Sequence, residues 1–85
     1  MAKEKKPFPC PEFGQYLRQL REAADLTQEQ FAEVADFDRT YVSGVERGER
    51  NVSLVNICRF ADALNLHPAK LFDFYKKPKR QKKPG

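Results

Sequence analysis

The stretch Thr27-Gln-Glu-Gln-Phe-Ala-Glu-Val-Ala-Asp-Phe-Asp-Arg-Thr-Tyr-Val-Ser-Gly-Val-Glu-Arg47 is typical of two short helices joined by a tight turn. Thr27 can cap the first helix, and Gln30 three residues later completes a capping box. Asp38 is a good N-cap for the second helix, and Gly48 suits its C-terminal end with a positive φ. These signals predict helices over residues 28–35 and 39–47.

The second of these helices has one apolar side and one polar side. Tyr41 or Val42, together with Val45, faces inward at the spacing of a helix. Four residues then face outward: Arg39, Thr40, Ser43 and Gly44. On an arbitrary amphipathic helix they would be ordinary solvated residues, but the two neighbouring capping signals favour a surface that contacts a ligand.

Duplex DNA is the ligand that this arrangement suits, because the second of two steeply crossing helices can enter a major groove. The guanidinium of Arg39 matches the O6 and N7 atoms of guanine, and Thr40 offers a methyl and a hydroxyl group, with Ser43 one turn later. Gly44 would let the backbone approach DNA, or would fit a crowded helix crossing. Tyr41 either packs its ring against the turn while its hydroxyl reaches the DNA backbone, or senses the shape of the groove.

The segments Asp38-Arg-Thr-Tyr-Val-Ser-Gly-Val-Glu-Arg-Gly48 and Arg50-Asn-Val-Ser53 resemble the phage-repressor and Cro-like (XRE-type) helix-turn-helix DNA-binding domain. They are especially similar to the controller proteins of restriction–modification systems. The resemblance covers residues 17–72. Asp36 stands where the family usually has glycine, so we expect slight strain in the turn and the same fold.

The resemblance also implies roles for residues around the reading helix. It implies contacts to DNA phosphates from Gln28, Arg47, Arg50 and Asn51. It further implies a partly buried ion pair between Arg21 and Glu46, which ties the first helix of the chain to the reading helix.

The predicted fold is an all-α, compact five-helix bundle with a helix-turn-helix, that is, a lambda-repressor-like DNA-binding domain. The expected helices cover residues 12–24, 28–35, 39–47, 54–64 and 67–75. The expected organisation is a flexible lead-in over 1–10, the DNA-binding domain over 11–75, and a disordered basic tail over 76–85.

The net charge of +4 is unevenly distributed along the 85 residues. Residues 7–75 hold seven basic and eleven acidic residues, so the body carries −4, while residues 76–85 carry +6. Arg39, Arg47 and Arg50 nevertheless cluster around the reading helix and can make a local positive face. The tail could attract DNA nonspecifically, improve solubility, or bind a partner.

Other classes of function find little support in the sequence. The single histidine, His67, precedes a proline where capping explains it, and no nucleophile–base pair indicates an enzyme. We expect no metal, no cofactor and no small-molecule effector. Cys10 and Cys58 are predicted to be reduced thiols. We expect a cytoplasmic, nucleoid-associated protein without a membrane span.

One such domain reads few base pairs, so useful affinity calls for a homodimer on a two-fold symmetric site. Surplus apolar residues near the C-terminal end predict the dimer interface: Leu66, Leu71, Phe74 and Tyr75. The other interpretation is that Leu71 and Phe72 are core residues and that Phe74 is merely exposed.

The sequence therefore predicts a sequence-specific transcriptional regulator that binds double-stranded DNA. By its resemblance to controllers, it would act on the promoter of its own operon. The alternatives are an antitoxin-like or phage-type repressor and, from another class, a helical protein-interaction module that does not bind DNA.

Overall fold

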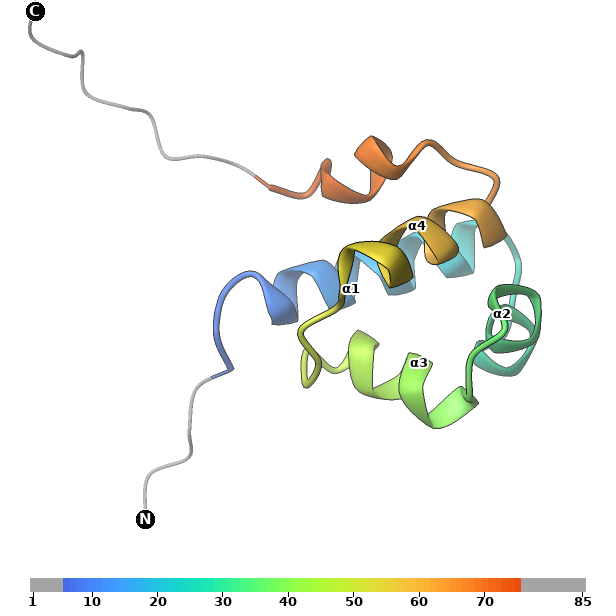
Figure 1. The fold of residues 1–85 in the computed structure, drawn as a ribbon, viewed down its shortest axis with the longest axis horizontal. Coiled ribbons are helices and arrows are strands. Elements are labelled where there is room, and N and C mark those ends of the chain that lie inside the picture. The colour runs from blue at the N-terminus through green and yellow to red at the C-terminus, as the bar shows by residue number, and fades with distance from the viewer. Residues whose placement is uncertain (1–5, 76–85) are drawn as a thin grey trace, which may run out of the picture.

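The computed structural model describes residues 6–75, and this part of the chain is helical without any strand. Four α-helices and one 3-10 helix follow one another along the chain: α1 (Cys10–Ala23), α2 (Gln28–Ala35), α3 (Arg39–Glu46), α4 (Leu54–Ala63) and η1 (Pro68–Phe72). Helix α3 packs against α1 and α2, whereas η1 packs against α4 and α1. Figure 1 shows α3 along one edge of the molecule and η1 along the opposite edge.

The prediction of a fifth α-helix over residues 67–75 is wrong, since Pro68–Phe72 forms a 3-10 helix of five residues. It starts as predicted at His67-Pro68, where His67 Nδ1 accepts a hydrogen bond of 3.1 Å from the backbone N–H of Ala69. A segment this short gains little from α-helical hydrogen bonds, and the tighter turn places Leu71 in the core. Helix α1 also begins two residues earlier than expected, at Cys10.

The capping box of α2 has the predicted geometry. The backbone N–H of Gln30 donates to Thr27 Oγ1 at 3.1 Å, and the backbone N–H of Thr27 donates to Gln30 Oε1 at 2.9 Å. Gly48 has the expected positive φ of 80°. Asp38 occupies the N-cap position of α3 with extended backbone, but its side chain makes no capping hydrogen bond. Asp38 is therefore the N-cap residue of α3 as predicted, although its carboxylate does not bond the helix N-terminus.

The turn between α2 and α3 is braced from α4. Asp36 adopts the left-handed conformation, with φ 62° and ψ 50°. Arg59 donates a hydrogen bond of 3.0 Å to the carbonyl of Ala35 and a second, shorter one to the carbonyl of Asp36. Its guanidinium also lies 4.1 Å from the ring centroid of Phe37. Arg59 thus satisfies carbonyls at the C-terminal end of α2, in the turn that orients α3.

The hydrophobic core draws on every helix. It contains Phe13, Leu17, Phe31, Ala32, Ala35, Val42, Val45, Phe60, Ala61 and Leu71. The rings of Phe31 and Phe60 lie 5.3 Å apart and join α2 to α4. Of the inner positions left open by the sequence, Ala35 and Val42 are buried, whereas Val34 is 59% exposed.

Helix α1 lies directly on the C-terminal end of α3. Gly14 permits this contact, because a Cβ atom there would lie 2.2 Å from the carbonyl oxygen of Val45. Arg21 Nε donates to Glu46 Oε2 at 2.7 Å, and Arg21 Nη2 donates to Glu46 Oε1 at 3.0 Å. Both side chains are buried, and the hydrogen bond to Glu46 raises the pKa of Arg21 despite the opposing effect of burial.

Helix α2 joins the same network, since Gln28 Nε2 donates to Glu46 Oε1 at 3.0 Å. Arg21 Nη1 also donates to the carbonyl of Leu26 at 2.8 Å. One buried carboxylate is thereby bonded to side chains of α1 and α2. The ion pair named from the sequence is present, and it fixes α3 against two neighbouring helices.

Replacing Glu46 tests this network. Glu46→Ala strands the buried Arg21 guanidinium and should lower the free energy of unfolding by about 3 kcal/mol. For a domain of this size, that corresponds to a fall in Tm of more than about 10 °C in a thermal melt followed by circular dichroism. Glu22→Ala, which breaks the exposed pair with Arg18, is the matched control and should change Tm little. Equal melts for the two variants would contradict the structural role of Glu46.

The left-handed residue of the turn offers a second test. Asp36→Gly should stabilise the protein by roughly 0.5–1 kcal/mol, because glycine adopts positive φ without strain. Asp36→Ala, which also removes the carboxylate, should destabilise it by a similar amount. Urea unfolding of the three proteins should therefore rank them glycine, aspartate, alanine. A higher midpoint for alanine than for glycine would show that backbone strain at Asp36 is not what matters.

Candidate nucleic-acid interface

The outer side of α3 presents two side chains without partners. Arg39 and Thr40 are exposed, and neither makes a side-chain hydrogen bond or ion pair within residues 6–75. Ser43, one turn later, is half-buried and accepts a short hydrogen bond from Arg47 Nη1. The N-terminal half of α3 therefore carries a free guanidinium and a free hydroxyl, which are groups that can bind base edges.

Gly44 does not face outward as expected. The residue is buried, and a Cβ atom built on it would lie 3.3 Å from Arg50 Nε and 3.5 Å from Arg50 Cγ. The chain reverses at Gly48, which brings Arg50 back across α3, with its guanidinium carbon 5.7 Å from the ring centroid of Tyr41. The absence of a side chain at Gly44 thus makes room for Arg50.

Tyr41 packs against the turn, the first of the two possibilities that the sequence left open. Its ring centroid lies 4.9 Å from that of Phe37 and 6.2 Å from that of Phe60. Its hydroxyl accepts a hydrogen bond of 3.0 Å from Asn56 Nδ2. Tyr41 therefore connects α3 to α4, and most of its surface is occupied within the protein.

A shallow open groove lies between the start of α2 and the start of α3. Arg21, Thr27, Gln28, Glu29 and Arg39 line it. The backbone N–H groups of Gln28 and Glu29 have no acceptor within the described residues, as is normal in the first turn of a helix. Such groups, next to the guanidinium of Arg39, favour an anion. Gln28 Nε2 is used to hold Glu46, so its amide also has a structural role.

Arg47 is exposed, but its guanidinium already has partners. Its Nε donates to Glu49 Oε2 at 3.1 Å and its Nη2 to Glu49 Oε1 at 3.1 Å. Lys6 Nζ donates to the carbonyl of Arg47 at 2.8 Å and lies 3.8 Å from Glu49 Oε2. The hydrogen bonds raise the pKa of Arg47 and, with the nearby Lys6 and Arg50, lower the pKa of Glu49. Asn51 is exposed beside this cluster.

Sequence reasoning missed four residues that shape this surface: Lys6, Glu49, Asn56 and Arg59. Glu49 follows Arg47 by two positions, and this spacing is not one at which helical side chains meet. Lys6 reaches Arg47 across 41 positions, and Arg59 reaches Ala35 across 24. No local pattern signals contacts of this kind.

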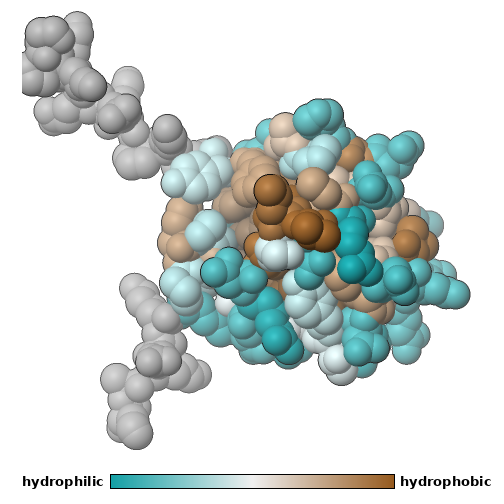
Figure 2. Space-filling view, viewed as in Figure 1, coloured by the Kyte–Doolittle hydropathy of each residue, from teal (hydrophilic) through white to brown (hydrophobic). Residues whose placement is uncertain are grey.

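Three exposed apolar side chains come from the start of α4 and the end of η1, and we call them together the apolar face. They are Leu54, Val55 and Phe72, which are 74%, 67% and 43% exposed. Figure 2 shows hydrophobic side chains gathered at the centre of one side of the molecule.

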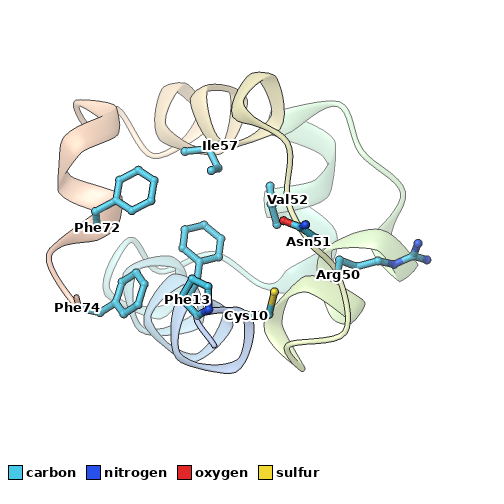
Figure 3. A pocket seen from close by; sticks show the side chains of 9 residues that line it. Cys10, Phe13, Arg50, Asn51, Val52, Ile57, Phe72 and Phe74 are labelled. Carbon is cyan, nitrogen blue, oxygen red and sulfur yellow. The ribbon is translucent and has the colours of Figure 1, made fainter. Parts of the chain in front are cut away.

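Beside the apolar face is a cavity of about 70 Å³, lined mainly by hydrophobic side chains. The lining residues are Pro9, Cys10, Phe13, Arg50, Asn51, Val52, Ile57, Phe72 and Phe74. Figure 3 shows Phe72 and Phe74 on one side of this cavity and Val52 on the other, with Ile57 above Phe13.

The residues predicted for a dimer interface differ in burial, and Tyr75, at 44%, is exposed. Leu71 is fully buried, so the expectation that it forms an interface is wrong. Its side chain is needed in the core of so small a domain. Leu66 and Phe74 are half-buried against the core, and the ring of Tyr75 lies 5.2 Å from that of Phe8. Phe72, which one interpretation placed in the core, is instead partly exposed.

None of the helices within residues 6–75 is both long and apolar enough to cross a membrane. The same residues contain no group of three His, Cys, Asp or Glu side chains that could hold a metal ion. Cys10 and Cys58 are both free thiols and half-buried.

Comparisons with known proteins agree with this geometry. Residues 12–72 match the family described as "Helix-turn-helix domain". Control protein C.BamHI of Bacillus amyloliquefaciens is 48% identical over 63 residues, covering 73% of this chain and 78% of that protein. Control protein C.MunI of Mycoplasma sp is 49% identical over 61 residues, covering 71% and 82%.

Solved structures give the same result. The restriction–modification controller protein C.AhdI from Aeromonas hydrophila has a TM-score of 0.73 and 56% identity, with 74% of this chain and 96% of that chain covered. The controller C.Esp1396I, solved as a tetramer with its natural 35-base-pair operator, has a TM-score of 0.73 and 27% identity, with 79% and 88% covered. The chain therefore belongs to the helix-turn-helix domain family and is a homologue of the restriction–modification controller proteins.

Proposed function

We propose that this protein is a sequence-specific transcriptional regulator of the controller type, which binds double-stranded DNA and acts on the promoter of its own operon. The observation that carries the proposal is the unpartnered Arg39 on the outer side of α3, next to the open groove at the start of α2. Its relative C.Esp1396I is a controller solved on its operator. Selection of bound sequences from random duplex DNA tests the proposal and would reveal any two-fold symmetry.

Base reading is assigned to the side chains that α3 leaves free. Arg39 would pair with O6 and N7 of a guanine, and Thr40 would meet a thymine methyl group. Ser43 would contribute from the next turn once Arg47 releases it. The packing of Tyr41 and the burial of Gly44 support indirect roles for these two residues, in holding α3 and in seating Arg50.

Phosphate contacts would flank the reading helix on both sides. At the start of α2, the free backbone N–H groups of Gln28 and Glu29 suit a phosphate oxygen. After α3, Arg47, Arg50 and Asn51 would meet the neighbouring strand. Such contacts set affinity and register but carry no sequence information. In this scheme residues 11–75 form the DNA-binding domain, residues 1–10 are its lead-in, and the basic tail, 76–85, adds nonspecific attraction.

We further propose a homodimer that is formed through the apolar face. Leu54 and Val55 are the most exposed large hydrophobic side chains of the described residues, and exposed apolar side chains near one another are typical of a surface that a partner covers. A second copy that covered them would give one assembly with two α3 helices, as a two-fold symmetric site requires. The relative C.Esp1396I is described as a tetramer on its operator, which supports self-association in this family.

The role of Arg39 can be measured directly. Arg39→Ala should cost roughly 1–3 kcal/mol in binding to the selected duplex, because a bidentate contact to guanine is lost. Binding to random duplex should change far less. Fluorescence anisotropy at fixed salt gives both affinities, and Arg18→Ala on α1 controls for the lost charge. If the protein were a protein-interaction module, Arg39→Ala would not change its affinity for the selected duplex. Equal losses of affinity on both duplexes would show that Arg39 does not read a base.

The dimer surface makes a separate prediction. At tens of micromolar, the wild-type chain should sediment as a dimer, and Val55→Glu should sediment as a monomer, because a charge would be buried in the interface. Tyr75→Glu, on the surface first expected from the sequence, should remain a dimer. Analytical ultracentrifugation separates the outcomes. A monomer for Tyr75→Glu but not for Val55→Glu would return the interface to the C-terminal segment.

A further inference from the structure

Glu49 binds the exposed guanidinium of Arg47 through the same two-bond arrangement that a phosphate would use. Two of its nitrogens face the two oxygens of Glu49, each at 3.1 Å, and the third donates to Ser43 Oγ. A planar guanidinium uses this two-bond arrangement for phosphates as well as for carboxylates. Glu49 therefore occupies the donors of Arg47 that a DNA backbone would use.

Neighbouring cations keep the carboxylate of Glu49 ionised and close to Arg47. Its hydrogen bonds with Arg47, reinforced by the charges of Arg47, Lys6 and Arg50, lower its pKa, so the carboxylate stays charged at neutral pH. Both members of the pair are well exposed, with side-chain exposures of 56% for Arg47 and 43% for Glu49. Because the pair is in contact with water, a phosphate can approach it and exchange with Glu49.

From this arrangement, we infer that Glu49 competes with DNA phosphate for the guanidinium of Arg47 and so sets the protein concentration at which DNA is bound. The inference rests on the proposed function. When a phosphate takes Arg47, Glu49 must turn away, and Lys6 is the cation placed to receive it, with Nζ 3.8 Å from Glu49 Oε2. The same exchange frees Ser43 from Arg47.

The geometry also allows an opposite role, which an experiment can separate. If Glu49 orients Arg47 toward the phosphate, its loss weakens binding. If Glu49 competes, its loss strengthens binding. Glu49→Gln keeps the size and one acceptor oxygen but removes the charge. The sign of the change in affinity therefore distinguishes competition from orientation.

For competition, Glu49→Gln should bind both selected and random duplex about three- to eightfold more tightly at 0.1 M salt, since one more cation is available to phosphate. The plot of log K against log salt should steepen by nearly one unit. The ratio of the two affinities should stay the same, because phosphate contacts carry no sequence information.

Glu22→Gln is the matched control, because Glu22 forms an exposed pair of 3.1 Å with Arg18 on α1, and Arg18 is not among the residues assigned to DNA contact. It raises the net charge of the protein equally and should change affinity less than twofold. In an Arg47→Ala background, the gain from Glu49→Gln should fall to the level of this control. A gain no larger than that of Glu22→Gln, or weaker binding, would overturn the inference.

The two proposals can fail separately in this experiment. Equal affinities of the wild-type chain for selected and random duplex would overturn sequence-specific regulation. The competition at Arg47 would still be measured on the random duplex. Conversely, a specific wild-type protein whose Glu49→Gln variant matches Glu22→Gln keeps its proposed function and loses this inference.

Discussion

The buried carboxylate of Glu46 dictates how α3 is held against α1 and α2. A charge removed from water must have all its partners in place, and here these partners are Arg21 from α1 and Gln28 from α2. Rotating α3 about its axis would break these bonds. Gly14 lets α1 come close enough for the network to close. Arg39 precedes Glu46 by about two helical turns on the same face of α3, and it lines one groove with Arg21 and Gln28, so the contacts that hold Glu46 also fix the position of Arg39.

The candidate interface combines a few cations near α3 with a body of net negative charge. Residues 7–75 carry a net charge of −4, so the body as a whole repels DNA. Within this body, attraction must come from a few cations near α3, and one of these, Arg47, is shared with Glu49. Arg50 is likewise engaged, lying across Gly44 and over Tyr41. Weak general attraction of this kind leaves a larger share of the binding free energy to the base contact proposed for Arg39.

Local signals made α2 and α3 predictable from sequence. The Thr27 capping box and the positive φ of Gly48 depend on neighbours within a few residues, and both occur where expected. Contacts across long stretches of chain were not predictable. Arg50 fills the space above Gly44 only because the loop after α3 folds back, and Leu71 is buried only because η1 packs on α4. Composition could not reveal which apolar residues such packing would use.

Burial separates the two arginine–glutamate pairs that flank the end of α3. The side chains of Arg21 and Glu46 are 9% and 3% exposed, whereas those of Arg47 and Glu49 are 56% and 43% exposed. Breaking the buried pair would leave a charged group without a partner and out of contact with water, so this pair cannot exchange partners while the protein stays folded. Breaking the exposed pair returns both groups to solvent at little cost. Both pairs consist of an arginine and a glutamate, and their members Glu46 and Arg47 are neighbours in the sequence. The buried pair can therefore hold α3 in place, while the exposed pair can open so that Arg47 binds a phosphate.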